Sequence, residues 1–123
     1  MKYLDSKTDN GGNILVSVLM SVYNQKSTIG SAIDSIFQQT FDNWELILVD
    51  DCSTDKSREI IKKLSTENSI IKYFFLEKNM GKGGALNKGF LEASGDIILT
   101  QDADLEYDPS DYSKLLRPFI DTD

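Results

Sequence analysis

Histidine is absent from the sequence, and cysteine occurs once among 123 residues. Without histidine, the chain cannot supply a His-based catalytic triad or a His-ligated zinc site. The lone Cys52 excludes a disulfide within the chain and, lacking a His partner, is interpreted as an inert thiol. Any metal is therefore expected to bind oxygen ligands, which favours hard cations such as Mg²⁺ or Mn²⁺.

Positive charge is scarce as well, since 13 basic residues face 20 acidic ones and the net charge is −7. Such a chain is not expected to bind nucleic acid or an anionic membrane surface as its main partner.

Long apolar runs are also missing. The longest, residues 14–23, is about half of the roughly 20 residues that span a bilayer, and two serines interrupt it. Because residues 1–12 lack the apolar core of a signal peptide, the sequence predicts a cytoplasmic protein.

The sequence does contain a regular alternation of short apolar runs and amphipathic stretches over residues 14–123, after a polar lead at residues 1–13. Runs rich in Val, Leu and Ile predict four strands, at residues 14–21, 45–49, 70–76 and 96–100. A helix is predicted after each strand, the last one opened by Pro109 and ended by Pro118. This order predicts one α/β domain with a mainly parallel sheet, helices on both faces, and ligands at the carboxyl ends of the strands.

The core is expected between this sheet and the apolar stripes of the helices. The stripe of the first helix has residues at i, i+3, i+4, i+7 and i+8: Ile29, Ala32, Ile33, Ile36 and Phe37. Six aromatic side chains are expected to be buried: Phe37, Phe41, Trp44, Phe74, Phe75 and Phe90.

Three residues at predicted strand ends could contact a base or ribose. Tyr23 follows the first strand, where its ring could stack on a base, although position alone favours a structural role. Asp50 and Asp51 end the second strand, where acidic residues of dinucleotide-binding folds accept hydrogen bonds from a ligand. In the alternative interpretation, Ser53 or Thr54 caps the next helix and both acids are exposed. We predict a ligand contact for at least one of the two aspartates.

Two carboxylates follow the fourth predicted strand. Residues two apart in a strand point to the same face, so Asp102 and Asp104 can converge on one ion, and Glu106 could add a third oxygen. Mg²⁺ and Mn²⁺ accept one or two carboxylates together with phosphate oxygens and water. A solvated loop is the alternative, but two carboxylates at the end of an apolar strand repel each other without a cation. The pattern therefore predicts a divalent metal held against a diphosphate.

Residues 78–84 contain three glycines and two lysines before a predicted helix that runs to about Ala93. Such a loop could face a phosphate. The stretch lacks the ending of a P-loop and does not match the dinucleotide-binding fingerprint. On these residues alone, a glycine-rich turn with solvated lysines is an equally good interpretation.

Several motifs in one order resemble the family 2 glycosyltransferases of GT-A fold. They lie at residues 16–24, 35–41 and 44–55 and in the Asp-x-Asp loop, so that the resemblance covers nearly all of the chain after residue 13. Within that family, residues 79–89 and 95–109 look like the polyprenyl-phosphate sugar transferases of the dolichol-phosphate mannose synthase type.

The resemblance implies a Rossmann-like GT-A fold and transfer of a sugar from a UDP- or GDP-sugar to an acceptor, with metal-assisted departure of the nucleoside diphosphate and inversion. By motif, it assigns donor binding to Ser21, Tyr23, Asn24, Asp50, Asp51, Lys82 and Asp102. It assigns a Mg²⁺ or Mn²⁺ ion to Asp102, Asp104 and Glu106. The resemblance leaves two acceptors open. A polyprenyl (lipid) phosphate is already ionised and needs no strong general base, whereas a sugar hydroxyl would need one.

Family catalytic domains continue beyond the Asp-x-Asp loop into an acceptor-binding half. We therefore expect this chain to hold a truncated domain with the donor half only, without a catalytic residue of its own, in a full-length protein at the cytoplasmic face of a membrane. Two alternatives stay open at this point. One is a non-catalytic nucleotide-binding module, and the other is a receiver-like Mg²⁺-binding signalling domain. The receiver is disfavoured because the acidic pair follows the second strand and no fifth strand supplies a lysine.

Overall fold

The computed structural model describes residues 14–39 and 41–103. Seven elements alternate along this part of the chain: β1 (Val16–Val22), α2 (Ile29–Phe37), β2 (Trp44–Asp50), α3 (Ser57–Glu67), β3 (Ile71–Phe75), α4 (Gly81–Glu92) and β4 (Ile97–Thr100). The predicted alternation of strands and helices is confirmed here. The polar lead at residues 1–13, the helix predicted from Pro109, and the carboxylates of Asp104 and Glu106 lie outside the described residues.

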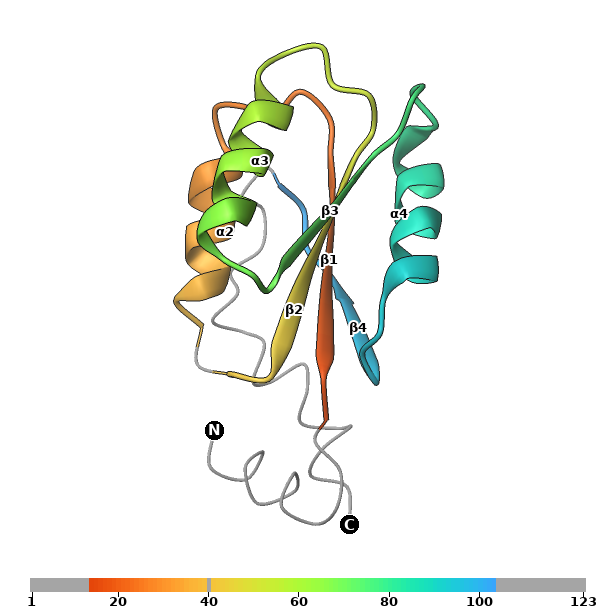
Figure 1. Cartoon of the computed structure of the whole chain (residues 1–123). Helices are drawn as coiled ribbons and strands as arrows, with labels where there is room; N and C mark the ends of the chain where they lie inside the picture. The colour runs from red at the N-terminus through yellow and green to blue at the C-terminus, as the bar shows by residue number, and fades with distance from the viewer. Residues whose placement is uncertain (1–13, 40, 104–123) are drawn as a thin grey trace.

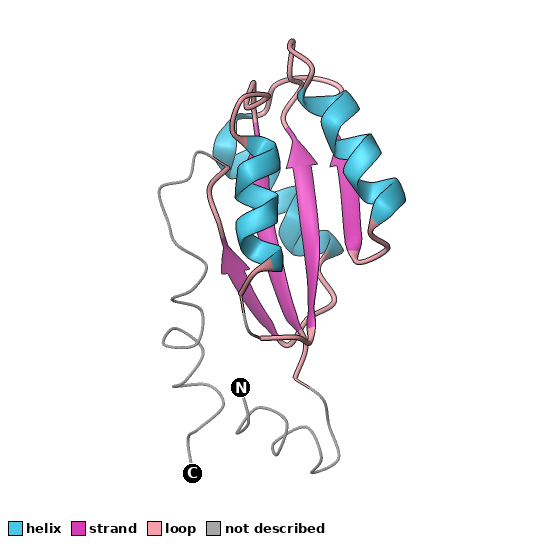
Figure 2. Cartoon of the chain, turned by 90° about the vertical axis from the view of Figure 1, so that its left-hand side faces the viewer, coloured by secondary structure: helices cyan, strands magenta, loops and turns pink. Residues whose placement is uncertain are grey.

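All four strands are parallel, in the order β3-β2-β1-β4, and their arrows point the same way in Figure 2. Helices α2 and α3 cover one face of the sheet, and α4 covers the other (Figure 1). The central strands β1 and β2 are therefore buried on both faces, which explains their nearly continuous apolar sequences. The predicted α/β class and mainly parallel sheet are confirmed. Among the described helices, none is both long and apolar enough to cross a membrane.

Side chains of β1 alternate between two apolar clusters. Val18 and Met20 pack in the larger cluster with α2 and α3, whereas Leu19 packs in the smaller cluster with Ala85 of α4. Helix α4 lies close to the sheet because Gly89 has no side chain there. A Cβ at Gly89 would collide with the side chain of Leu19.

Helix α4 begins inside the stretch that was expected to be a loop. Gly81 has a φ of 79°, a backbone conformation that glycine adopts without strain, and residues 82–84 already belong to the helix. The loop prediction for residues 81–84 is therefore wrong. Glycines weaken a helix on their own, but packing of Ala85 and Gly89 against the sheet stabilises this one.

Two of the six aromatic side chains expected in the core are exposed. Phe41 is buried, and Trp44, Phe74 and Phe75 are partly buried against the clusters. Phe90 is 47% exposed because Ala85 and Gly89 of the same helix are the buried residues that face the sheet. Phe37 ends α2 and is 36% exposed, with its ring edge against the ring of Trp44.

A buried carboxylate fastens the end of the sheet where the strands begin. Glu45 of β2 accepts hydrogen bonds from Ser17 Oγ at 2.6 Å, from Lys72 Nζ at 2.8 Å and from Ser94 N at 2.9 Å. It therefore joins β1, β2, β3 and the turn between α4 and β4. Burial raises the pKa of Glu45, but the hydrogen bonds from Lys72, Ser17 and Ser94 outweigh it and lower that pKa from 4.5 to about 2.

We expect Glu45→Gln to destabilise the fold by about 1–3 kcal/mol at pH 7, because buried hydrogen bonds to a charged group are lost. A carboxylate whose folded pKa is lowered stabilises the fold above its unfolded pKa. That stability disappears as the pH falls through the folded pKa, here between 4.5 and about 2. Urea unfolding of both proteins at pH 7 and pH 3 should therefore show a smaller difference at pH 3.

The matched control is Glu67→Gln, which changes an exposed carboxylate at the end of α3. Its free energy of unfolding should stay close to that of the unchanged chain at both pH values. An equal loss for Glu45→Gln at pH 7 and pH 3 would show that the ionised carboxylate is not the stabilising group.

Candidate functional site

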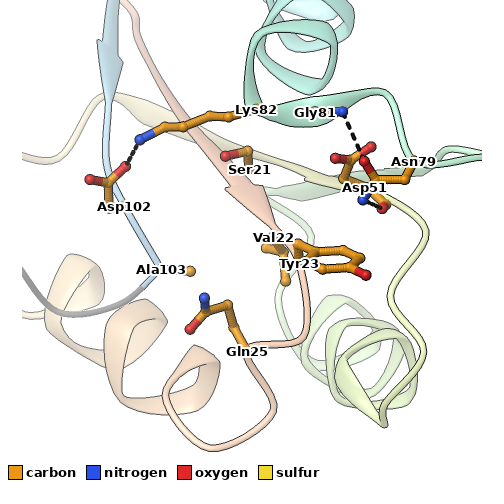
Figure 3. Close-up of a pocket in the computed structure, with 10 residues that line it drawn as sticks. All are labelled: Ser21, Val22, Tyr23, Gln25, Asp51, Asn79, Gly81, Lys82, Asp102 and Ala103. Carbon is orange, nitrogen blue, oxygen red and sulfur yellow. Dashed lines mark hydrogen bonds and ion pairs between the residues drawn. The ribbon is translucent and has the colours of Figure 1, made fainter.

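A pocket of about 460 Å³ lies at the carboxyl ends of the strands (Figure 3), within the size range of small-molecule sites. Ten residues line it: Ser21, Val22, Tyr23, Gln25, Asp51, Asn79, Gly81, Lys82, Asp102 and Ala103. They come from the end of β1 and its loop, the end of β2, the start of α4 and the segment after β4. The pocket thus lies at the edge of the sheet where the strand-end rule predicts ligands.

Five of the seven residues assigned to donor binding line this pocket: Ser21, Tyr23, Asp51, Lys82 and Asp102. In Figure 3, Tyr23 and Asp51 lie on one side, Asp102 lies on the other, and the Lys82 side chain extends between them above Ser21. The remaining two, Asn24 and Asp50, do not line it. The fold thus brings together residues that are up to 81 positions apart in the sequence.

Asp51 is held rigidly at the β2 end of the pocket. Its backbone N–H donates to Val22 O at 2.8 Å, which continues the β1–β2 pairing by one residue. Its Oδ1 accepts a hydrogen bond from Met80 N at 2.6 Å, and its backbone O accepts one from Asn79 Nδ2 at 3.2 Å. The side chain is 4% exposed. Asp51 is therefore a fixed acceptor, suited to an N–H or O–H group of a ligand.

Tyr23 supplies a flat apolar surface beside this acceptor. It directly follows β1, lines the pocket and is 46% exposed (Figure 3). An exposed aromatic ring next to a hydrogen-bond acceptor is the combination that binds a planar heterocycle, by stacking on one side and edge recognition on the other. Position alone favoured a structural role for Tyr23, but the residue is not buried in the core.

Lys82 and Asp102 form an ion pair across the other half of the pocket. Lys82 Nζ lies 2.7 Å from Asp102 Oδ1, and the two side chains are 62% and 21% exposed. Lys82 belongs to the first turn of α4, where backbone N–H groups and the helix dipole also favour an anion. This half therefore combines one carboxylate with positive charge, whereas the Tyr23 half does not.

Asp102 fits the role of a metal ligand, since its carboxylate already attracts a cation within 2.7 Å. Mg²⁺ and Mn²⁺ take one or two carboxylates and complete their shell with water and phosphate oxygens. The described residues contain no group of three or more His, Cys, Asp and Glu side chains that could hold a metal by themselves. The predicted ligands Asp104 and Glu106 lie outside those residues.

Asp50, which was also predicted to contact a ligand, has protein groups as partners in this structure. Its side chain is fully buried and accepts hydrogen bonds from Arg58 Nε at 2.6 Å and from Ser53 N at 2.9 Å. Ser53 Oγ also donates to it, at 2.5 Å. Strand geometry explains the difference from Asp51, because neighbouring residues of a strand point to opposite faces. Asp50 therefore anchors α3 and the loop that follows β2.

Asn24 likewise holds a loop. It has a φ of 52°, and its Oδ1 accepts hydrogen bonds from Thr54 N at 2.7 Å and from Asp55 N at 3.2 Å. Its own N–H donates to Ser53 Oγ at 2.9 Å. The loops after β1 and β2 are thus tied together, so that Tyr23 and Asp51 keep their relative positions.

Sequence reasoning did not single out Asn79 and Gln25 as site residues. Asn79 lies in the predicted phosphate-facing stretch, and its polar side chain could have been found there. It donates to Asp51 O and accepts from Gly81 N at 3.1 Å. Gln25 had no such signal, because it reaches the pocket only through the fold of the loop between β1 and α2.

Comparison with known proteins decides the family. The model of glycosyl transferase family 2 matches residues 17–123. The chain belongs to this family. Family membership, together with the parallel sheet, supports the predicted Rossmann-like GT-A fold and leaves the receiver-like alternative without support.

Two curated transferases are similar over most of this chain. An uncharacterized glycosyltransferase of Nostoc sp. is 37% identical over 109 residues, which cover 88% of this chain and 34% of that protein. An undecaprenyl-phosphate 4-deoxy-4-formamido-L-arabinose transferase of Photorhabdus laumondii is 36% identical over 107 residues, covering 83% of this chain and 33% of that protein. The chain spans about a third of the length of these relatives.

Two solved structures of glycosyltransferases share the fold. The mannosyltransferase PcManGT of Pyrobaculum calidifontis, in complex with GDP-Man and Mn²⁺, superposes with a TM-score of 0.71 at 27% identity, over 78% of this chain and 29% of that one. TarS of S. aureus in complex with UDP-GlcNAc has a TM-score of 0.75 at 32% identity, over 88% of this chain and 31% of that one.

The exposed ring of Tyr23 in the pocket can be tested by substitution. We expect Tyr23→Ala to weaken binding of UDP or GDP by about tenfold, since stacking of a base on an aromatic ring contributes roughly 1–3 kcal/mol. Tyr23→Phe should bind close to the unchanged chain. Isothermal titration calorimetry measures both.

Tyr73→Ala is the control, because Tyr73 is an exposed tyrosine of β3 that does not line the pocket. Its affinity for the nucleotide should not change. Equal affinities for Tyr23→Ala and Tyr73→Ala would contradict a stacking role.

Proposed function

We propose that this chain forms the nucleotide-sugar site of a glycosyltransferase that moves a sugar from a UDP- or GDP-sugar to an acceptor. The observation that carries the proposal is the division of one pocket into two halves. Tyr23 and Asp51 offer a surface and an acceptor to a base, and Lys82 and Asp102 offer charge to a diphosphate and its cation. The solved structures in complex with GDP-Man and Mn²⁺ or with UDP-GlcNAc support a nucleotide-sugar as the ligand.

In the proposed complex, the base stacks on Tyr23 and donates to the Asp51 carboxylate, which Met80 N holds in place. Ser21, near the end of β1, lies between the two halves, and we propose that it contacts the ribose or the first phosphate. Asn24 and Asp50 support these residues through the loops and have no direct contact with the donor in this proposal.

The metal is proposed to be Mg²⁺ or Mn²⁺, held by Asp102 with Asp104 and Glu106 as further ligands. When bound, such a cation stabilises the charge that develops on the departing nucleoside diphosphate. Lys82 would give up part of its contact with Asp102 and donate a charge-assisted hydrogen bond to a diphosphate oxygen instead. Asp102 and Lys82 together therefore orient the diphosphate.

The proposed reaction is a direct displacement at the anomeric carbon, with inversion. An acceptor oxygen forms a bond to this carbon as the bond to the β-phosphate oxygen breaks, and the electron pair stays on the nucleoside diphosphate. We propose a polyprenyl phosphate as acceptor, on the motif resemblance and on similarity to undecaprenyl-phosphate transferases. A phosphate acceptor is ionised at neutral pH and needs no strong base, and its lipid would bring the protein to the cytoplasmic face of a membrane.

Binding calorimetry tests this function directly. We expect the chain to bind UDP-GlcNAc or GDP-mannose at least about tenfold more tightly with Mn²⁺ than with EDTA, because metal and diphosphate neutralise each other's charge in one site. Asp102→Asn should lose this dependence on metal. Asp34→Asn, on the exposed side of α2, should keep it. Equal affinity with Mn²⁺ and with EDTA would remove the metal from the proposal.

Transfer itself separates an enzyme from a non-catalytic binding module. A glycosyltransferase should convert a polyprenyl phosphate and a labelled donor into a labelled lipid, with release of the nucleoside diphosphate. A module that only binds the donor would show the calorimetric signal and form no labelled lipid.

A separate expectation concerns Lys82. We expect Lys82→Met to weaken UDP or GDP binding by about tenfold and to leave uridine or guanosine binding unchanged, because only the diphosphate contacts the ammonium. Mn²⁺ without nucleotide should bind up to about fivefold more tightly, since an exposed ion pair competes only modestly with a metal.

Lys88→Met is the matched control, because Lys88 lies on the same helix and also pairs with a carboxylate, Glu92, at 2.8 Å. The affinities of Lys88→Met for UDP or GDP and for Mn²⁺ should not change. A loss of nucleoside binding in Lys82→Met would instead indicate a general disturbance of the pocket.

A further inference from the structure

Thr28 is placed where a helix cap is expected, but its hydroxyl has another partner. It is the N-cap residue of α2, and threonine at this position usually accepts a hydrogen bond from a backbone N–H of the first turn, which contributes about 1 kcal/mol. Here no side-chain cap hydrogen bond forms. The hydroxyl instead donates to Ala103 O at 2.8 Å, across 75 positions of sequence.

The Thr28 hydroxyl is fixed on its own side of this contact. The backbone N–H of Thr28 donates to Gln25 O at 3.0 Å, and its carbonyl accepts from Ala32 N at 2.9 Å. Gln25 Oε1 lies 2.9 Å from the same hydroxyl and competes with the slightly nearer Ala103 O for its single hydrogen. Thr28 therefore joins the loop between β1 and α2, which carries Tyr23, to the segment after β4, which carries Asp102.

This segment needs such a support because the sheet no longer holds it. The pairing of β4 with β1 runs as far as Thr100, and Gln101 N still donates to Leu19 O at 2.9 Å. Beyond that point, Ala103 is buried against the larger apolar cluster, and Asp102 pairs with the largely exposed Lys82. The hydrogen bond to Ala103 O fixes the backbone directly after Asp102.

We propose that Thr28 is a positioning residue for the metal and diphosphate half of the pocket. By holding the Ala103 carbonyl, its hydroxyl keeps the Asp102 carboxylate at the separation from Lys82 at which one cation and one diphosphate bind together. The missing helix cap is consistent with this role, because the hydroxyl that could have capped α2 is directed to Ala103 O. The inference rests on the proposed function and adds a residue that does not itself touch the ligand.

The test uses Thr28→Val, which keeps the shape of the side chain and removes its hydroxyl. We expect metal-dependent affinity for UDP or GDP to fall by about five- to tenfold, which corresponds to one lost hydrogen bond. Affinity for uridine or guanosine should not change, because Tyr23 and Asp51 are not affected. Mn²⁺ binding in the presence of nucleotide, followed by electron paramagnetic resonance, should weaken in parallel. Thr28→Ser restores the hydroxyl and should restore both affinities.

Thr66→Val is the matched control. Thr66 lies on α3 and its hydroxyl also donates to a backbone carbonyl, that of Lys63, at 2.7 Å. This variant should bind nucleotide and Mn²⁺ like the unchanged chain. Thermal unfolding of all three variants separates positioning from stability, since a purely structural role would lower the melting temperature of Thr28→Val and weaken nucleoside and nucleotide binding equally.

The outcomes distinguish the inference from the function on which it rests. If the unchanged chain fails to bind nucleotide with Mn²⁺, the proposed function fails and this inference with it. If the unchanged chain binds and Thr28→Val binds equally well, the positioning role is overturned and the proposed function stands. Weak binding in Thr28→Ser would also contradict a role for the hydroxyl.

Discussion

Strand β1 pairs with β2 on one side and with β4 on the other, and the pocket depends on these two parallel ladders. Parallel strands end at the same edge of a sheet, so the residue that follows each one arrives beside the others. The ladders extend past the strands themselves, through Asp51 N to Val22 O and Gln101 N to Leu19 O. Tyr23, Asp51 and Asp102 therefore come within one pocket although they are far apart in sequence.

The two ends of the sheet have different tasks. At the end where the strands begin, the Glu45 carboxylate accepts hydrogen bonds from protein donors, and these bonds lower its pKa to about 2. At the other end, Asp102 is partly exposed and has an exchangeable cation, the Lys82 ammonium, beside it. Asp50 lies at the same end as Asp102, but its side chain is fully buried and holds a loop in place. Acidic residues in this chain thus stabilise the fold or remain available for ligands according to burial and partners.

Much of the fold was predictable because it depends on local patterns. Buried strands are read from continuous apolar runs, and helix α2 from its apolar spacing. Residues 81–84 were predicted as a loop because glycine is a turn signal. They are helical because packing of Ala85 and Gly89 against the sheet stabilises α4. Phe90 was misplaced for the same reason, since the small residues of α4 take the buried face.

The candidate site was predictable only in part. The strand ends identified Tyr23, Asp51 and Asp102 as candidates, and the structure places all three in the pocket. Asp50 and Asp51 look equivalent in sequence, and only the direction of each side chain separates a buried anchor from a pocket residue. Gln25 and Thr28 could not be found, because Gln25 reaches the pocket, and Thr28 reaches the Ala103 carbonyl, only in the folded chain.

The measurement that tests the account most directly is a nuclear magnetic resonance titration of the isotope-labelled chain with UDP or GDP, first with Mg²⁺ and then with paramagnetic Mn²⁺. With Mg²⁺ and nucleotide together, the backbone amide signals of Ser21, Asp51, Lys82 and Asp102 should shift, and Mn²⁺ should broaden those of Lys82 and Asp102 most strongly. Amides at the other end of the sheet, such as Ser17 and Ser94, should not change. A second hollow is lined by Phe75, Met80 and Lys88 among other residues. Shifts centred there, or shifts that are the same with and without the metal, would contradict the account.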